Sequence, residues 1–149
     1  MNNINGNRLW CRSTEEKIIQ AFLDGVTKKI SVRDSVNCYN DYRKVYRLWN
    51  TDLVSTDGEN VFIYIASNME ERDRYWQPNG FSTWQPREYI ISNTTKSRLN
   101  AFLDYYDFNS LEVHSSQKDW SVKYNGKLLN VDSWYKLDFD KKELVEVEK

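Results

Sequence analysis

The side chains able to take part in acid–base chemistry are few. Histidine is the usual general base, and the chain has one, His114. In the segment Leu-Glu-Val-His at residues 111–114 apolar and polar residues alternate, so we expect His114 to share the outward face of a strand with Glu112. No serine or cysteine nucleophile motif accompanies it, so the sequence predicts a solvated histidine and not a catalytic base.

Carboxylates form two small groups. Asp104 and Asp107 are three residues apart, a spacing that would place both on one side of a helix, where they could share a metal ion. The acidic residues at 70–73 lie beside two arginines, as solvated charges often do. The chain has no HExxH, no CxxC and no glycine-rich phosphate-binding loop. We therefore expect no metal, no cofactor and no enzymatic activity, with a metal-dependent hydrolase as a remote alternative.

The most distinctive segment is YWQPNGFSTWQP at residues 75–86, in which Trp-Gln-Pro occurs twice around a Pro-Asn-Gly turn signal. Each proline restricts its own backbone and that of the residue before it, and stiff presentation lowers the ordering cost of binding. Trp, Tyr and Arg dominate binding hot spots. The residues that we predict to bind a partner are Arg72, Arg74, Tyr75, Trp76, Phe81, Trp84 and Arg87. In the structural alternative, Trp76 and Trp84 fold inward as lids on a sheet.

Two helices are predicted to support this segment. The first begins at Ser13 with a capping-box pattern completed by Glu16, carries an apolar face and ends at Gly25. The second begins at residues 93–95, where Thr94 or Thr95 would act as the cap, and ends near Asp107. Both contain Ala-Phe-Leu-Asp, which either records a duplication or reflects two core helices that use the same good helix formers.

Strand patterns occupy most of the remaining chain. We expect antiparallel neighbours at residues 30–32, 44–49 and 61–65, a long loop at 68–88 and a short strand at 88–91. Further strands are predicted at 111–114, 120–124, 127–131, 135–139 and 144–147, with an Asn125-Gly126 hairpin turn. The sequence thus predicts an α+β fold: an antiparallel sheet of about five to seven strands with two main helices.

Composition agrees with one domain over residues 1–149. The net charge of −1 lacks the strong positive charge of a duplex-binding protein. The charge is uneven, because residues 1–50 carry nine Lys or Arg against five acids, whereas residues 101–149 carry seven against ten. One face of the molecule could therefore meet an anionic partner.

The cellular location is predicted from the N-terminal sequence and from the length of the apolar runs. Residues 1–11 lack the apolar segment of a secretory signal, and the longest apolar run, residues 61–66, is too short to span a bilayer. We therefore expect a cytoplasmic protein that does not bind membranes. In that compartment Cys11 and Cys38 are expected to be reduced thiols.

The segment YIISNTTKSRLN at residues 89–100, with the later Lys-Asp-Trp-Ser-Val at 118–122, resembles small uncharacterised phage proteins. These share a Thr-Thr-Lys-x-Arg-Leu/Ile-Asn helix start and a tryptophan-containing strand, and the likeness covers about residues 43–124. It carries no catalytic residues to transfer. It implies a phage-encoded protein in the host-cell cytoplasm, and small phage proteins of this kind often bind and block a host machine, including CRISPR nucleases.

Two functions follow as expectations. The first is a non-enzymatic, anti-CRISPR-like inhibitor that blocks a host protein or a protein–nucleic acid complex through residues 72–87. The alternative is a single-stranded nucleic-acid-binding accessory protein, in which Tyr75, Trp76, Phe81 and Trp84 stack on unpaired bases.

Overall fold

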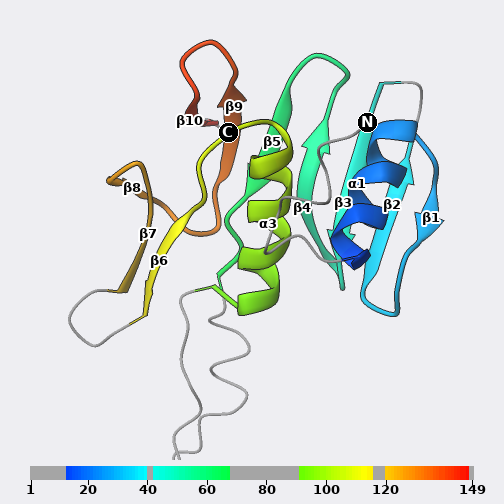
Figure 1. Ribbon diagram of the computed structural model, residues 1–149, viewed down its shortest axis with the longest axis horizontal. Helices are drawn as coiled ribbons and strands as arrows, with labels where there is room; N and C mark the ends of the chain where they lie inside the picture. The colour runs from blue at the N-terminus through cyan, green and yellow to red at the C-terminus, as the bar shows by residue number, and fades with distance from the viewer. Residues whose placement is uncertain (1–12, 40–41, 68–90, 116–119, 148–149) are drawn as a thin grey trace, which may run out of the picture.

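A computed structural model describes residues 13–39, 42–67, 91–115 and 120–147 (Figure 1). The elements, in chain order, are α1 (Ser13–Asp24), β1 (Lys28–Lys29), β2 (Asp34–Cys38), β3 (Lys44–Leu48), β4 (Thr51–Thr56), β5 (Val61–Tyr64), α3 (Asn93–Tyr105), β6 (Glu112–Ser115), β7 (Trp120–Tyr124), β8 (Lys127–Leu129), β9 (Trp134–Asp138) and β10 (Glu143–Glu146). The predicted α+β fold with an antiparallel sheet and two main helices is confirmed.

The main sheet is antiparallel and has seven strands in the order β1-β2-β3-β4-β5-β9-β10. Residues that pair across neighbouring strands point to the same face of a sheet. One such row runs through Val36, Tyr46, Val54, Ile63 and Tyr135, and all five side chains are buried. This row forms the floor of the hydrophobic core.

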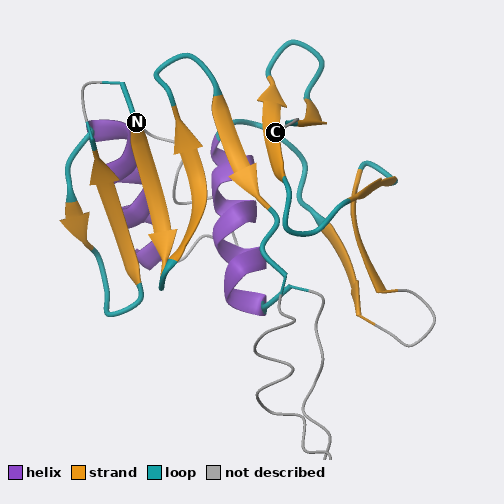
Figure 2. Cartoon of the chain, turned by 180° about the vertical axis from the view of Figure 1, so that it is seen from behind, coloured by secondary structure: helices purple, strands orange, loops and turns teal. Residues whose placement is uncertain are grey.

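Both helices cover that same face. In Figure 1 α1 and α3 lie in front of the strands, and in Figure 2, seen from behind, the strands lie in front of the helices. The ring of Phe102 packs edge-on against Phe22, with centroids 5.2 Å apart, and stacks on Tyr46 at 5.7 Å. The repeated Ala-Phe-Leu face therefore serves the same purpose in both helices, which either explanation of the repeat allows.

The helix ends follow from local sequence. Gly25 has a φ of 69°, the left-handed conformation that glycine adopts at low cost, and it ends α1 as predicted. The cap of α3 differs from the prediction: Ser92, and not Thr94 or Thr95, is the N-cap, and its hydroxyl accepts a hydrogen bond from the Thr95 amide at 3.0 Å. A serine one turn before the apolar face fits the cap position equally well, so the sequence pattern was ambiguous.

Three strands, β1, β2 and β4, were not predicted, and one prediction was wrong. Residues 30–32 form the turn between β1 and β2 and are not a strand. Strand β2 begins with a buried aspartate on its core face, so its sequence does not show the alternation of apolar and polar residues that predicts a strand. Strand β4 contains a bulge opposite Tyr46 and Arg47 that places both Leu53 and Val54 in buried positions, so its period of two is interrupted.

The second sheet has three strands in the order β6-β7-β8. Its tight turn is the predicted Asn125-Gly126 pair, and both residues have positive φ, 51° and 81°, as a primed hairpin turn requires. The sheet is attached to the β9–β10 hairpin by hydrogen bonds. The Tyr124 hydroxyl donates to the Lys142 carbonyl at 3.4 Å, and the side-chain amide of Asn130, which directly follows β8, donates to Glu146 at 3.1 Å.

Candidate functional site

The residues predicted from sequence to bind a partner all lie at 72–87, outside the described residues, so that assignment stays a prediction. The chain positions that flank this segment are well anchored. The Ser67 amide donates to Oδ1 of Asp132 at 2.9 Å, and Ser92 caps α3. The predicted strand at 88–91 also falls mostly outside the described residues.

A cluster of charged side chains that the sequence did not single out lies inside the fold. Arg98 on α3 is 5% exposed, and Asp34 on β2 and Glu15 on α1 are each 1% exposed. Nε and Nη2 of Arg98 donate to the two carboxylate oxygens of Asp34 at 3.0 and 3.2 Å, while Nη1 donates to Glu15 at 2.9 Å. The Ser97 hydroxyl donates to the same Glu15 oxygen at 2.6 Å. One guanidinium thus ties both helices to the sheet.

The environment fixes the protonation state of this cluster. Burial alone raises the pKa of Asp34, but hydrogen bonds from Arg98, Tyr46 and Ser31 outweigh it and hold that pKa below its usual value. Burial, followed by the hydrogen bond to Asp34, raises the pKa of Tyr46. Asp34 is therefore a carboxylate and Tyr46 a neutral donor at neutral pH. Because the charges are buried and mutually bonded, the cluster positions elements and offers no accessible reactive group.

The sequence held a signal for this cluster. Glu15 precedes Ile18, Ile19 and Phe22 by three, four and seven residues, which is the spacing of one helix face. Asp34 lies two residues before the buried Val36 and so on the same face of β2. Both acids therefore occupy positions that an apolar residue would normally fill. Arg98 is buried between the two helices and β2.

The face of the main sheet opposite the helices is a second candidate. One register row crosses it through residues of six strands: Asn37, Val45, Ser55, Phe62, Lys136 and Val145. In the described part of the chain no helix or strand covers this face (Figure 2). Trp134 pairs with Tyr64 beside this row, and their rings are 5.2 Å apart. Antiparallel sheets commonly leave one face to solvent, but that face is then usually polar.

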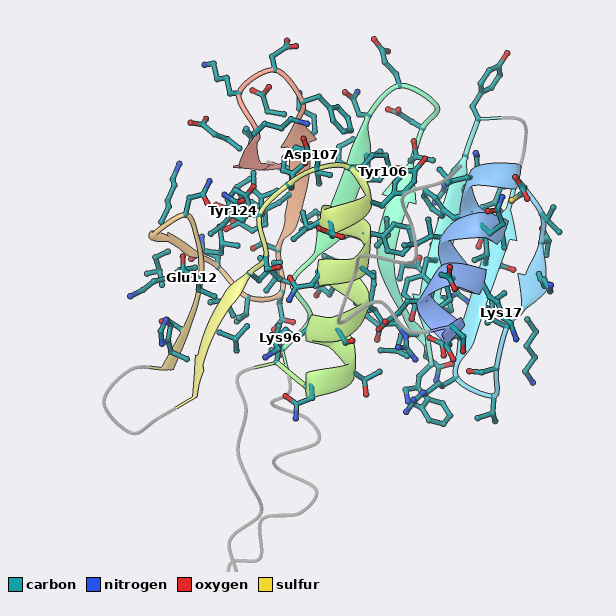
Figure 3. All side chains as sticks on the ribbon, in the orientation of Figure 1. Lys17, Lys96, Tyr106, Asp107, Glu112 and Tyr124 are labelled. Atoms are coloured by element: carbon teal, nitrogen blue, oxygen red, sulfur yellow. The ribbon has the colours of Figure 1, made fainter. Side chains whose placement is uncertain are left out.

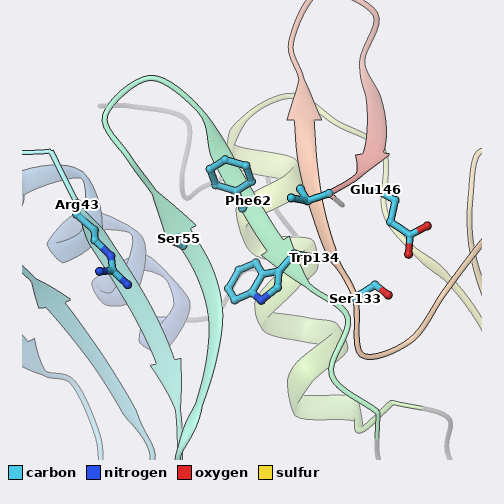
Figure 4. Close-up of a pocket in the computed structure, with 7 residues that line it drawn as sticks. Arg43, Ser55, Phe62, Ser133, Trp134 and Glu146 are labelled. Carbon is cyan, nitrogen blue, oxygen red and sulfur yellow. The ribbon is translucent and has the colours of Figure 1, made fainter. Parts of the chain in front are cut away.

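A hollow of about 830 Å³ lies on this open face (Figure 4). The described residues that line it are Arg43, Ser55, Phe62, Ser133, Trp134, Glu146 and Val147. In Figure 4 the guanidinium of Arg43 and the indole of Trp134 lie on either side of Ser55, and the Glu146 carboxylate points away. Arg43 also lies over the Tyr39 ring, 5.0 Å from its centroid. The hollow thus combines two aromatic rings with a valine, two serines, one cation and one carboxylate.

The end of the sheet near the β1–β2 and β3–β4 turns is a third candidate. Trp49 occupies the first position of the two-residue turn after β3, with a φ of 54° and 62% of its surface exposed. A left-handed backbone costs a bulky residue roughly 1 kcal/mol or more. A smaller hollow of about 290 Å³ adjoins it, and its lining includes Lys28, Lys29 and Arg33.

The remaining residues considered for acid–base chemistry or metal binding are either exposed or not placed to act together. His114 and Glu112 are both exposed on β6, as expected. Asp107 lies past the end of α3 with a φ of 67°, so it does not share a helix face with Asp104 (Figure 3). Among the described residues there is no group of three or more His, Cys, Asp or Glu side chains that could hold a metal.

No helix in the described ranges combines the length and the apolar character needed to cross a bilayer. Comparisons of the chain with protein-family models, with curated proteins and with solved structures found no match.

Proposed function

We propose that the protein is a non-enzymatic binding protein that engages a partner protein through the hollow on the open face of its main sheet. The observation that carries this proposal is the position of Phe62 and Trp134. They lie diagonally across strands β5 and β9 on the face opposite the helices, at the hollow that Arg43 borders. Tryptophan and arginine are the residue types most enriched in binding hot spots.

The chemistry of the hollow favours a protein partner. Its lining combines two aromatic rings, Val147 and two serines with the charged Arg43 and Glu146, and the exposed Val145 lies nearby on β10. Interface centres are depleted in charge and enriched in aromatic side chains. The Arg43 guanidinium already rests on Tyr39, so its position is restrained before binding. A partner that presents an apolar side chain next to a carboxylate would match this surface.

A blocking role fits such a surface. A small protein that covers a working surface of a host enzyme needs complementary contacts and no reaction of its own. Inhibition of a host defence nuclease by a phage-encoded protein in the host cytoplasm remains part of this proposal, supported by the sequence resemblance. The aromatic and arginine residues at 72–87 are proposed as a second contact region.

A quantitative pull-down tests this function and separates the two regions. Tagged wild-type protein should recover a partner from lysate of the host cell, identified by mass spectrometry. We expect Trp134→Ala to reduce recovery at least tenfold, since truncation of a hot-spot tryptophan costs about 2 kcal/mol or more. Arg43→Ala, at an exposed residue, should give a smaller loss.

Two controls make the result interpretable. Leu128→Ala changes a residue that is 64% exposed on β8 and should leave recovery unchanged. Each variant is first checked for a cooperative thermal transition. If folded Trp134→Ala and Arg43→Ala recover the partner fully while Trp76→Ala with Trp84→Ala does not, the contact region is 72–87 and the open-face assignment is wrong.

A further inference from the structure

We propose that the sheet end formed by the β1–β2 and β3–β4 turns binds single-stranded nucleic acid. Trp49 would stack on an unpaired base, while Lys28, Lys29 and Arg33 would contact the phosphates. This site uses none of the residues that line the hollow around Trp134, so it does not rest on the proposed protein contact. It also differs from the segment 72–87 to which the sequence assigned base stacking.

The position of Trp49 points to a ligand with a flat ring. Its backbone adopts a conformation that favours glycine. The residue at this position is nevertheless tryptophan, the amino acid with the largest side chain, and 62% of its surface is exposed. The Trp49 amide donates to the Arg33 carbonyl at 2.7 Å, which joins the two turns and fixes the backbone that carries the indole. Strain at an exposed aromatic residue is typical of a functional position. Indole stacking on bases is tolerant of sequence.

The charge around Trp49 is positive despite the overall charge of −1. Lys28 and Lys29 are exposed, and Arg33 is 44% exposed in its side chain. The two neighbouring acids are already engaged. Asp34 is buried against Arg98 and also lies 3.8 Å from Nε of Arg33. Asp52 accepts a hydrogen bond from Arg47 at 2.7 Å. A phosphate group would therefore share Arg33 with Asp34, whereas Lys28 and Lys29 form no ion pair with a carboxylate of the described residues.

The turn that carries Arg33 and directly follows Lys28 and Lys29 is built before any ligand arrives. The Ser31 hydroxyl accepts hydrogen bonds from the amides of Arg33 and Asp34 at 3.2 and 3.1 Å and donates to the Asp34 carboxylate at 2.7 Å. Asp34 is in turn held by Arg98 on α3. The buried cluster thus reaches the surface through Ser31 and pre-organises the binding turn.

Protection of the sheet edge explains only part of this surface. Lysines on the short edge strand β1 would discourage pairing with another chain. That role does not require Arg33 beyond the strand, nor an exposed tryptophan on the neighbouring turn. An unpaired, charged strand of nucleic acid accounts for both, because it offers bases to the indole and phosphates to all three cations.

Fluorescence anisotropy with labelled 15-nucleotide dT and rU strands tests the proposal. With three phosphate contacts, the slope of log Kd against log salt is about 2, so Kd should rise about 20-fold between 50 and 200 mM salt. Lys28→Glu with Lys29→Glu should weaken binding and reduce that rise to about threefold. A 15-base-pair duplex should bind at least tenfold more weakly, because its bases are not free to stack.

Trp49→Gly is the decisive variant, since glycine suits the positive φ. We expect its Tm to equal or exceed that of the wild type by a few degrees, while its affinity for the single strands falls at least tenfold. Trp134→Ala, at the proposed protein contact, should bind oligonucleotide as the wild type does. Equal affinity of wild type and Trp49→Gly, equal affinity for duplex, or no binding at 50 mM salt would each overturn the proposal.

Discussion

Arg98 on α3 holds Asp34 on β2 side-on, with Nε 3.0 Å from Oδ1 and Nη2 3.2 Å from Oδ2. This fork–fork geometry is the strongest form of an Arg–carboxylate contact. The third guanidinium nitrogen reaches Glu15 on α1 at 2.9 Å. Three elements that are distant in the chain therefore meet at one buried cation, and the turn that carries Arg33 is built on one of its partners.

The first prediction concerns the loss of this cation. Arg98→Met leaves Asp34 and Glu15 buried without their partner, so we expect the free energy of unfolding to fall by about 3–5 kcal/mol. Urea denaturation measures this change. Arg33→Ala, which removes a largely exposed guanidinium, is the matched control and should cost less than about 1 kcal/mol. A loss below 1 kcal/mol for Arg98→Met would contradict the structural role.

A companion variant separates charge from packing. Arg98→Met combined with Asp34→Leu and Glu15→Leu removes all three charges, and an apolar replacement of a buried charged cluster is often neutral or stabilising. The triple variant should therefore be more stable than Arg98→Met alone. If it is equally unstable, the main contribution of Arg98 is its packing.

The second prediction is a pH dependence that Asp34 controls. Its pKa is lower in the folded chain than the ordinary value near 4, so it stabilises the fold above that pH, and the contribution disappears as pH falls through the folded pKa. We expect the wild type to lose stability between about pH 5 and pH 2. Asp34→Asn should lose less over that range. Identical pH profiles from urea titrations would contradict this assignment.

The third prediction compares two turn glycines. Gly58 and Gly126 both have positive φ, at 95° and 81°, so alanine at either position is strained. A Cβ at Gly58 would lie 3.1 Å from Cβ of Tyr42, whereas a Cβ at Gly126 would meet nothing within 4 Å. Gly126→Ala should cost about 1 kcal/mol and Gly58→Ala clearly more. Chemical denaturation of the two variants provides the measurement, and equal losses would show that Tyr42 moves aside freely.

The sequence predicted those parts of the fold in which each residue obeys a local period. Both helices and the Asn125-Gly126 hairpin were found because their apolar spacing and turn residues agree. Strand β4 was missed because its bulge breaks the alternation, and β2 because Asp34 takes a core position. A buried charge is recognisable only when its partner is known, and Arg98 is 64 residues from Asp34.

The candidate surfaces were harder to predict than the fold. The repeated Trp-Gln-Pro makes residues 75–86 distinctive in the sequence, whereas Trp134 and Trp49 stand in ordinary strand and turn contexts. Trp134 directly precedes the buried Tyr135, so the sequence indicates that Trp134 points away from the core. Its proximity to Phe62, however, depends on the pairing of β5 with β9. The exposure of Trp49 depends on a backbone conformation that its residue type disfavours.

Site-specific photo-crosslinking tests the central claim most directly. A benzophenone amino acid replaces Phe62 on the open face, and in a second protein it replaces Leu128 on β8 as the matched exposed control. The account predicts a discrete protein adduct from position 62 in lysate of the host cell, a reduction of that adduct at least tenfold by Trp134→Ala, and no such adduct from position 128. Equal adducts from both positions, or none from position 62 with a folded protein, would contradict it.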